Sequence, residues 1–342
     1  MKRNHNIVFD LQRFATETQT TLLEGLSPEM KIYYESRLID YAEPNLVHDQ
    51  FADKYPIPKN NGKTIEFRKY DSLGKALTPL TEGVTPDGDS LNVKTITATV
   101  DQYGNYIRLS DMLSMTAIDN NVLQSLKLLG AQAGKTLDSI TRDILAGGTN
   151  VIYANDGTGR SALTTANTLK PIDFFKAQAQ LEAMNAPKID GSYVAIIHPY
   201  AAFDLMTSPE WIDVHKYADA TKIFEGEIGK LANIRFVSST EAKIWNDETC
   251  PVKTAADEEH NKPAVYYSVF STLVLGANAY GTTEIEGGGL QTIVKQLGAG
   301  DDPLNQRSTV GWKATKVAER LVEQYMLRIE SLSAYSGTAK AN

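Results

Sequence analysis

Residues 111–146 read DMLSMTAIDNNVLQSLKLLGAQAGKTLDSITRDILA, and this stretch decides the fold of the chain. From residue 122 onward its apolar residues recur at steps of three and four, a spacing that places them on one face of a helix. Gly147 and Gly148 follow, as is typical after a helix C-terminus. A helix over 121–146 would be about 35–40 Å long, so we expect a spine against which other elements pack. Its apolar face is predicted to contain Val122, Leu126, Leu129, Ala133, Leu137, Ile140 and Ile144, widened by Leu123, Leu128 and Leu145.

The opposite side of this helix is polar, and we expect it to face solvent. It carries Gln124, Lys127, Gln132, Lys135, Asp138 and Arg142. The segment GAQAGKT at 130–136 is similar to a phosphate-binding loop, but it is one residue short of the motif and lies within a helix instead of between a strand and a helix. We therefore interpret Gly130 and Gly134 as sites of close packing.

The composition indicates an ordinary globular protein. The 342 residues suffice for two or three domains, or for one domain with large insertions. A net charge of −8 argues against a surface devoted to nucleic-acid binding, which requires clustered Lys and Arg. The single cysteine, Cys250, excludes an intrachain disulfide and a CxxC zinc site, and its acidic neighbours indicate an inert surface thiol. Because no signal peptide or membrane-spanning apolar run is found, we expect a soluble protein of a reducing compartment with no membrane partner.

An extended β excursion is predicted between residues 55 and 109. Apolar and polar residues alternate over 63–70, where Ile65 and Phe67 share one face, and again over 94–100. The connecting residues 71–93 contain several Gly and Pro residues and little apolar content. Loops of this length are uncommon in compact domains and are usually functional. We expect this loop to contact a partner chain.

Shorter elements are predicted in the rest of the chain. A helix is expected from Ser27 and Pro28 to Pro44. Residues 170–280 are predicted to form a mixed α/β domain, with helices at 171–185 and 199–206 and strands at 193–197, 234–237 and 264–275. Residues 308–333 allow two interpretations, because their apolar residues fit a helical stripe while 325–329 also fits a strand.

No catalytic, cofactor or metal site is predicted. The five histidines include no HExxH pair, and the chain has no GxSxG. His198 follows a predicted strand, a position that suits a general base, although capping of a strand end or pairing with a buried carbonyl is the favoured interpretation. Asp87-Gly88-Asp89 and Asp301-Asp302 do not complete a calcium-binding loop.

Several short stretches together resemble the major capsid proteins of tailed bacteriophages, specifically the podovirus-like capsid family named after phage N-four. The similarity covers nearly the whole chain and rests on the order and spacing of the stretches. They are FDLQRFA at 9–15, LTEGVTPDG at 80–88, QYG at 102–104, IIHP at 196–199, GEIG at 226–229, RFV at 235–237, DPLN at 302–305 and TVGWK at 309–313. One departure is the stretch GKLAN at 229–233, which lacks the glycine expected before the strand at Ile234.

This resemblance implies the tailed-phage major capsid fold, or Johnson fold, which is an α+β architecture. It implies an N-terminal arm at 1–30, an extended β-loop at 55–109 and a peripheral domain at 31–54 and 110–169 that contains the spine helix. A mixed α/β axial domain would occupy 170–289. Residues 290–342 would return to the peripheral domain and form the C-terminal tail, and 310–333 would be strand-rich.

The function that the resemblance implies is structural. Subunits would assemble into hexamers and pentamers of an icosahedral shell that encloses double-stranded DNA without sequence-specific binding. A scaffolding protein and a portal would be further partners, and the protein would reside in the virion after assembly in the bacterial host cytoplasm. Two alternatives are a cellular nanocompartment shell of the encapsulin type and a soluble α/β enzyme that uses His198. We expect subunit contacts at Phe9, Phe14, Ile65 and Phe67, with rim charges at Arg68, Lys69 and Glu82.

Overall fold

The computed structural model describes residues 19–20, 47–70, 73–79, 82–83, 88–116, 121–209, 211, 227–231, 233–254, 264–298 and 302–342. The chain forms two compact units. Unit 1 comprises Met1–Asn45, Gln102–Thr136 and Gly288–Thr315, and unit 2 comprises Leu46–Asp101, Leu137–Gly287 and Lys316–Asn342. The helix predicted after Ser27 and the predicted contact residues Phe9 and Phe14 lie outside the described residues.

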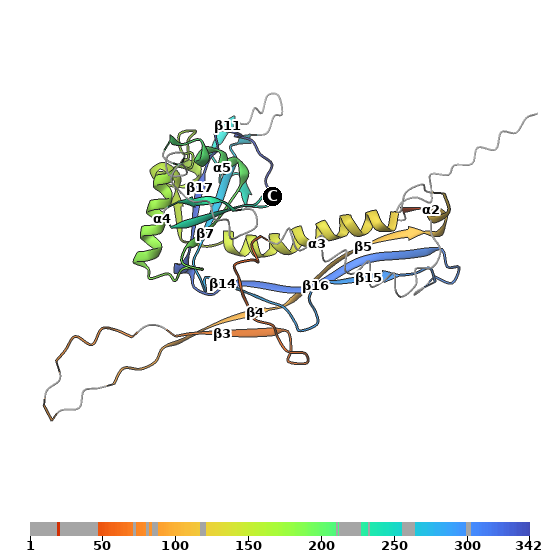
Figure 1. Cartoon of the computed structure of the whole chain (residues 1–342), viewed down its shortest axis with the longest axis horizontal. Coiled ribbons are helices and arrows are strands. Elements are labelled where there is room, and N and C mark those ends of the chain that lie inside the picture. The colour runs from red at the N-terminus through yellow and green to blue at the C-terminus, as the bar shows by residue number, and fades with distance from the viewer. Residues whose placement is uncertain are drawn as a thin grey trace, which may run out of the picture. The chain divides into compact units, whose positions relative to one another are not determined.

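A seven-stranded mixed sheet forms the centre of unit 2 (Figure 1). Its strands are β6 (Val151–Tyr153), β17 (Met326–Ser331), β13 (Val269–Leu275), β7 (Tyr193–Ile197), β9 (Ile234–Ser238) and β8 (Glu227–Leu231) in spatial order, with β10 (Ile244–Trp245) paired to β13. Every residue of β7, β13 and β17 is buried. Both faces of these strands are therefore covered. This explains why β7 (YVAII) reads as a continuous apolar run in sequence, whereas β17 (MLRIES) buries Arg328 and Glu330 as an ion pair.

Two helices pack into the same core as this sheet. They are α4 (Pro171–Ala183) and α5 (Pro199–Met206). Phe174 of α4 and Leu205 of α5 join Phe236 and Phe270 in one apolar cluster. The predicted elements at 193–197 and 199–206 are confirmed to the residue, because a short buried strand followed by His-Pro leaves a sharp boundary between them.

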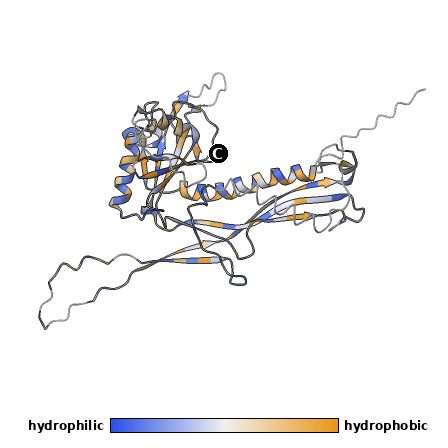
Figure 2. Ribbon diagram, viewed as in Figure 1, coloured by the Kyte–Doolittle hydropathy of each residue, from blue (hydrophilic) through white to orange (hydrophobic). Residues whose placement is uncertain are grey.

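The spine helix is α3, and it runs over Asn121–Ala146 as predicted. Hydrophobic and hydrophilic residues alternate around it (Figure 2). Leu126, Leu129, Ala133 and Leu145 are buried as expected. Gly130 and Gly134 are also buried, as expected of close-packing sites.

The predicted polar face of α3 is wrong at two positions. Asp138 and Arg142 are fully or nearly fully buried, because each is paired within the fold. Leu128, which was predicted to widen the apolar face, is instead 68% exposed in this chain. Periodicity identifies the helix but does not distinguish a solvated charge from a buried, paired one.

Residues 308–333 are strands, and the helical interpretation is wrong. They form most of β16 (Arg307–Arg320), a short η5 turn (Glu323–Tyr325) and β17. Burial in β16 follows a period of two, with Trp312, Ala314, Lys316 and Ala318 on the covered side. The strand-rich segment that the capsid resemblance implied is confirmed.

The described part of unit 1 is built on β5 (Asp101–Ser110), β15 (Gln291–Lys295) and the first half of β16. The first sixteen residues of α3 and the short α2 (Asp111–Thr116) complete it. β1 (Gln19–Thr20) pairs in parallel with the end of β5. Two glycines permit a close approach of β5 and β16: a Cβ on Gly104 would lie 2.6 Å from the Trp312 carbonyl oxygen, and one on Gly311 would lie 2.9 Å from the Asn105 carbonyl oxygen.

The remaining elements of unit 2 are short strands and turns. β14 (Tyr280–Thr283) pairs with the second half of β16 and with β2 (Asp53–Lys54). A two-stranded ribbon consists of β11 (Val252–Thr254) and β12 (Val265–Tyr266). Two turns, η3 (Ala154–Asp156) and η4 (Arg160–Ala162), follow β6. A separate antiparallel hairpin consists of β3 (Thr64–Tyr70) and β4 (Val93–Thr99), and it continues into the long loop (Figure 1).

Candidate assembly interface

Five of the seven residues predicted as subunit contacts lie in the hairpin β3–β4 or in its loop. They are Ile65, Phe67, Arg68, Lys69 and Glu82. Alternate side chains of β3 are half-buried and exposed, as the sequence alternation predicted. Ile65 and Phe67 lie opposite Ala98 and Ile96 on β4. Phe67 also makes an edge-to-face contact with Tyr55, with ring centroids 5.3 Å apart. Phe67 is thus partly used inside its own chain.

Burial is greatest near the base of this hairpin and least in the loop. Ala98, near its base, is only 3% exposed, whereas Leu77 and Leu91 in the loop are 81% and 70% exposed. Tyr70, Val93 and Leu73 are exposed as well. We call these five side chains, Tyr70, Leu73, Leu77, Leu91 and Val93, the tip residues. Contiguous apolar patches on a surface mark binding sites, so the tip residues are candidate contacts with a partner.

Sequence reasoning missed the tip residues. The loop as a whole has little apolar content, and strand alternation predicts Ile65 and Phe67 as the contacts instead. The available signal was the presence of isolated leucines, Leu73, Leu77 and Leu91, within a Gly- and Pro-containing stretch that has no periodicity. An apolar residue outside any periodic pattern has no predicted burial partner in its own chain.

The predicted rim charges lie on the same hairpin and loop. Arg68 is exposed and approaches Glu66 at 3.8 Å, a surface pair that contributes little to stability. Lys69 lies opposite Lys94 across the strand pair, and Glu82 is exposed in the loop.

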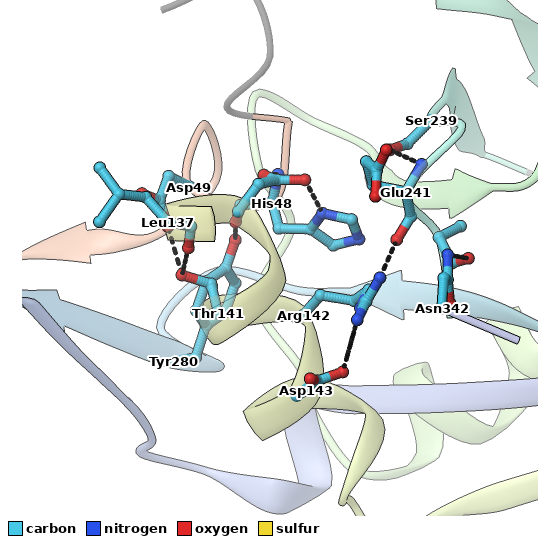
Figure 3. Close-up of polar contacts among 12 residues, drawn as sticks. His48, Asp49, Leu137, Thr141, Arg142, Asp143, Ser239, Glu241, Tyr280 and Asn342 are labelled. Carbon is cyan, nitrogen blue, oxygen red and sulfur yellow. Dashed lines mark hydrogen bonds and ion pairs between the residues drawn. The ribbon is translucent and has the colours of Figure 1, made fainter. Parts of the chain in front are cut away.

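A buried polar cluster holds the chain segment that leads into the hairpin (Figure 3). The backbone N–H of His48 donates to Asp138 Oδ1 at 2.7 Å, and His48 Nδ1 lies 2.6 Å from Asp138 Oδ2. Both side chains are completely buried. Tyr280 donates its hydroxyl proton to the His48 carbonyl oxygen. Burial, together with the nearby Asp49 and Asp138 carboxylates, raises the pKa of Tyr280 well above its usual value, so it stays a donor.

Asp49, the next residue, completes this cluster. It accepts hydrogen bonds from Thr141 Oγ1 at 2.5 Å and from Lys316 Nζ. Lys316 also donates to the Leu137 carbonyl oxygen at 3.1 Å. These contacts fix residues 48–49 against the last turns of α3 and against β16. They also explain why Asp138 and Lys316 are buried although both are charged residue types.

A second buried cluster holds the C-terminus of α3. Arg328 Nη1 donates to the carbonyl oxygens of Ala146 and Gly148, so it caps the helix end. Glu330 is fully buried and accepts hydrogen bonds from Arg160 and from Arg328 at 2.7–2.8 Å. The guanidinium of Arg160 stacks on Trp245, 3.8 Å from the ring centroid. Burial lowers the pKa of Arg328, and the Glu330 carboxylate opposes this effect.

Comparison with known proteins identifies the family. The family model described as phage capsid protein matches residues 93–322, which is well over half of the 342 residues. The chain belongs to this phage capsid protein family. A search of curated protein sequences finds no match.

The fold of this capsid protein is shared with solved phage capsids. The capsid of Ralstonia phage GP4 has a TM-score of 0.64 at 14% identity, covering 96% of this chain and 98% of that chain. The capsid structure of cyanophage P-SCSP1u has a TM-score of 0.61 at 17% identity, covering 84% and 89%. The cyanophage Pam1 capsid has a TM-score of 0.60 at 12% identity, covering 96% and 99%. The expected Johnson fold is confirmed, and the chain is a structural major capsid protein.

The capsid protein uses His198 for structure. Its Nδ1 accepts a hydrogen bond from the Tyr200 backbone N–H at 3.1 Å, and this bond caps α5. The ring packs against Phe270, with centroids 5.1 Å apart. Burial lowers the pKa of His198 from 6.5 to about 4, although the Glu241 charge opposes this. The ring is therefore neutral at physiological pH with Nδ1 already occupied. It caps the helix α5, not a strand end or a buried carbonyl as expected from sequence.

Two other sequence expectations are corrected or explained. Cys250 is buried, not on the surface, and burial raises the pKa of its thiol. The glycine expected before Ile234 is replaced by Asn233, which adopts a positive φ of 58°. Asparagine is the non-glycine residue that adopts this conformation most readily, so the turn is preserved.

Neither a metal cluster nor a membrane-spanning helix is found in the described part of the capsid protein. No group of three or more His, Cys, Asp or Glu side chains there is arranged to hold a metal ion. None of the described helices is sufficiently long and apolar to cross a membrane.

Proposed function

We propose that this capsid protein assembles into hexamers and pentamers of an icosahedral shell, with residues 55–109 as an extended loop that binds a neighbouring subunit. The observation that carries the proposal is the set of tip residues. Five apolar side chains are exposed at the far part of a hairpin that is buried near its base at Ala98, and the segment that leads into this hairpin is anchored at His48. A second copy of the chain is the partner that a shell supplies to every subunit. Rings of such subunits need heterologous contacts that close on themselves.

The other parts of the chain take the roles expected of the fold. Residues 1–30 act as an arm, with Phe9 and Phe14 as contacts. Residues 31–54 and 110–169 form the peripheral domain around α3, residues 170–289 form the axial domain, and 290–342 return to the peripheral domain. Ile65, Phe67, Arg68, Lys69 and Glu82 then contact the neighbour together with the tip residues.

The shell is proposed to enclose double-stranded DNA, with a scaffolding protein and a portal as assembly partners in the host cytoplasm. The net charge of −8 supports a container that does not bind DNA tightly. A strongly basic wall would add a salt-dependent attraction for every phosphate contacted and would oppose release. The role is structural, with no catalytic step. No observation on this chain favours a cellular nanocompartment over a phage shell.

The test is the size of the assembled protein. We would compare the wild type with a variant in which Leu73, Leu77 and Leu91 are replaced by serine, using light scattering and negative-stain electron microscopy. A deletion of residues 1–30 tests the arm in the same way. Val252→Ser, an exposed valine on β11, is the matched control.

Rings or shells are expected from the wild type and the control, and small species from the serine variant. Assembly of the serine variant at the wild-type concentration would show that the loop is not the contact. A wild-type monomer near 37.6 kDa, with or without a co-expressed scaffold, would overturn the proposed function.

A further inference from the structure

Asn61 and Gly62 form the only Asn-Gly pair in the chain. They lie just before β3, between the anchored segment that starts at His48 and the hairpin. Both residues are exposed. We propose that this pair is a site of spontaneous chemical modification, in which Asn61 loses ammonia and is converted to aspartate and isoaspartate. The proposal does not depend on the assembly proposed above.

The reaction is an attack of the Gly62 main-chain nitrogen on the Asn61 side-chain carbonyl carbon. A C–N bond forms, the amide nitrogen leaves as ammonia, and the proton lost by Gly62 completes the balance. The product is a five-membered succinimide ring. Water then opens either of its two carbonyls, which yields aspartate or isoaspartate. No oxidant, reductant or enzyme is needed.

The local structure leaves the two reacting groups accessible. Gly62 has φ of +82°, and a Cβ built on it would meet no atom within 4 Å. Glycine has no side chain that would hinder the attack, and the space beside its Cα is open. Within the described residues, neither the Gly62 N–H nor the Asn61 side chain makes a hydrogen bond that would hold it away from the other.

The charge around the pair favours the reaction. Residues 54–65 contain three lysines, Lys54, Lys59 and Lys63, and no acidic residue. The attacking nitrogen and the tetrahedral intermediate both carry negative charge, which nearby ammonium groups stabilise. The new carboxylate would lie in the same cationic segment, so the folded protein tolerates the product.

The position of the pair gives the modification a structural consequence. The Asn61 N–H donates to the Pro58 carbonyl oxygen at 3.3 Å on one side, and the Lys63 carbonyl oxygen accepts from the Val100 N–H at 2.8 Å on the other. Isoaspartate inserts one additional methylene into the main chain between these two fixed points. The hairpin base must then shift, while the seven-stranded sheet is unaffected.

The test is peptide mapping of the purified full-length protein after incubation at mildly alkaline pH. We expect the Asn61 peptide to gain one mass unit sooner than any other asparagine peptide, and to separate chromatographically into aspartate and isoaspartate forms. Asn60 is the matched internal control, because it lies in the same turn but is followed by asparagine, and fragmentation of the shared peptide assigns the mass gain to Asn60 or Asn61. Asn105, whose side chain is held by Gln132 and Tyr106, is a second control.

Asn61→Gln keeps the amide but requires a larger ring, so this variant should abolish the mass gain in that peptide. Asn61→Asp marks the elution position of the aspartate product. The proposal is overturned if Asn61 is modified no faster than Asn60 and Asn105, or if the rate does not increase with pH. It is also overturned if the Asn61→Gln peptide gains mass as fast as the wild type.

Discussion

The hairpin tip and the seven-stranded sheet use the same kinds of residue in opposite ways. In β7 and β13 every side chain is buried, while the five tip residues are left in solvent. Complete burial of one large aliphatic or aromatic side chain contributes about 1.5–3 kcal/mol. The sheet obtains this free energy when the subunit folds, and the tip residues can obtain it only on association. Stability and assembly should therefore be separable by mutation.

The largest effect on stability is expected at Glu330. Glu330→Ala removes the carboxylate between Arg160 and Arg328 and leaves a buried guanidinium without its counter-charge. Loss of one partner of a buried ion pair costs about 3–5 kcal/mol. Denaturant unfolding monitored by circular dichroism measures this loss. Glu182→Ala, in an exposed pair with Lys188, is the control and should leave the midpoint unchanged.

A smaller loss is expected at the cluster that anchors the hairpin. Asp138→Ala leaves the backbone N–H and the ring N–H of His48 buried without acceptors. A buried donor left unsatisfied costs about 1–3 kcal/mol. The same unfolding experiment measures it, and protease sensitivity of residues 55–109 should rise in parallel. An unchanged midpoint would mean that this cluster does not hold the segment.

A pH-dependent effect is expected at His198. In the unfolded chain histidine binds a proton below pH 6.5, while folded His198 stays neutral down to about pH 4. The unfolded state then binds more protons in this interval, so the free energy of unfolding falls as the pH drops from 6.5 to 4, by at most about 3 kcal/mol.

His198→Asn keeps a side-chain acceptor for the Tyr200 N–H and removes the titration. Its stability should decline less than that of the wild type over the same interval. Equal slopes for the two proteins would exclude His198 as the source of the acid sensitivity.

The smallest effect on stability is expected at the tip residues. Leu73→Ser, Leu77→Ser and Leu91→Ser should each change the free energy of unfolding of the free subunit by about 0.5 kcal/mol or less, because exposed positions contribute little. Loss of assembly with an unchanged unfolding midpoint would confirm the separation. A large loss of stability would show instead that the tip residues pack within their own chain.

Most of the architecture could be predicted from the sequence wherever apolar residues repeat regularly or form a continuous run. The 26 residues of α3, the strand β7 and the helix α5 were all predicted with their correct ends. The wrong predictions concern charged residues that are buried. Asp138, Arg142 and Lys316 are buried because of partners far away in the sequence. A helical or strand period contains no information about such partners.

The candidate interface could be predicted only in part. Strand alternation led to the prediction of Ile65 and Phe67 as contacts, but a period cannot lead to Leu77, which belongs to no regular element. The close approach at Gly104 and Gly311 shows the same limit. Both glycines lie in stretches that resemble capsid proteins. A side chain is excluded at each of them by a close contact between β5 and β16, two strands separated by about two hundred residues of chain.

The position of β17 has a consequence for how the chain is made. Residues 326–331 follow every other strand of this sheet in sequence, yet β17 lies between β6 and β13 and bonds to both. Until these residues have left the ribosome, β13 cannot form its longest strand pairing, which is with β17, and Arg160 cannot form its ion pair with Glu330. The central sheet is therefore completed only after residue 331 has been translated. A chain that stops before residue 326 therefore lacks the strand that joins β6 to β13 in this sheet.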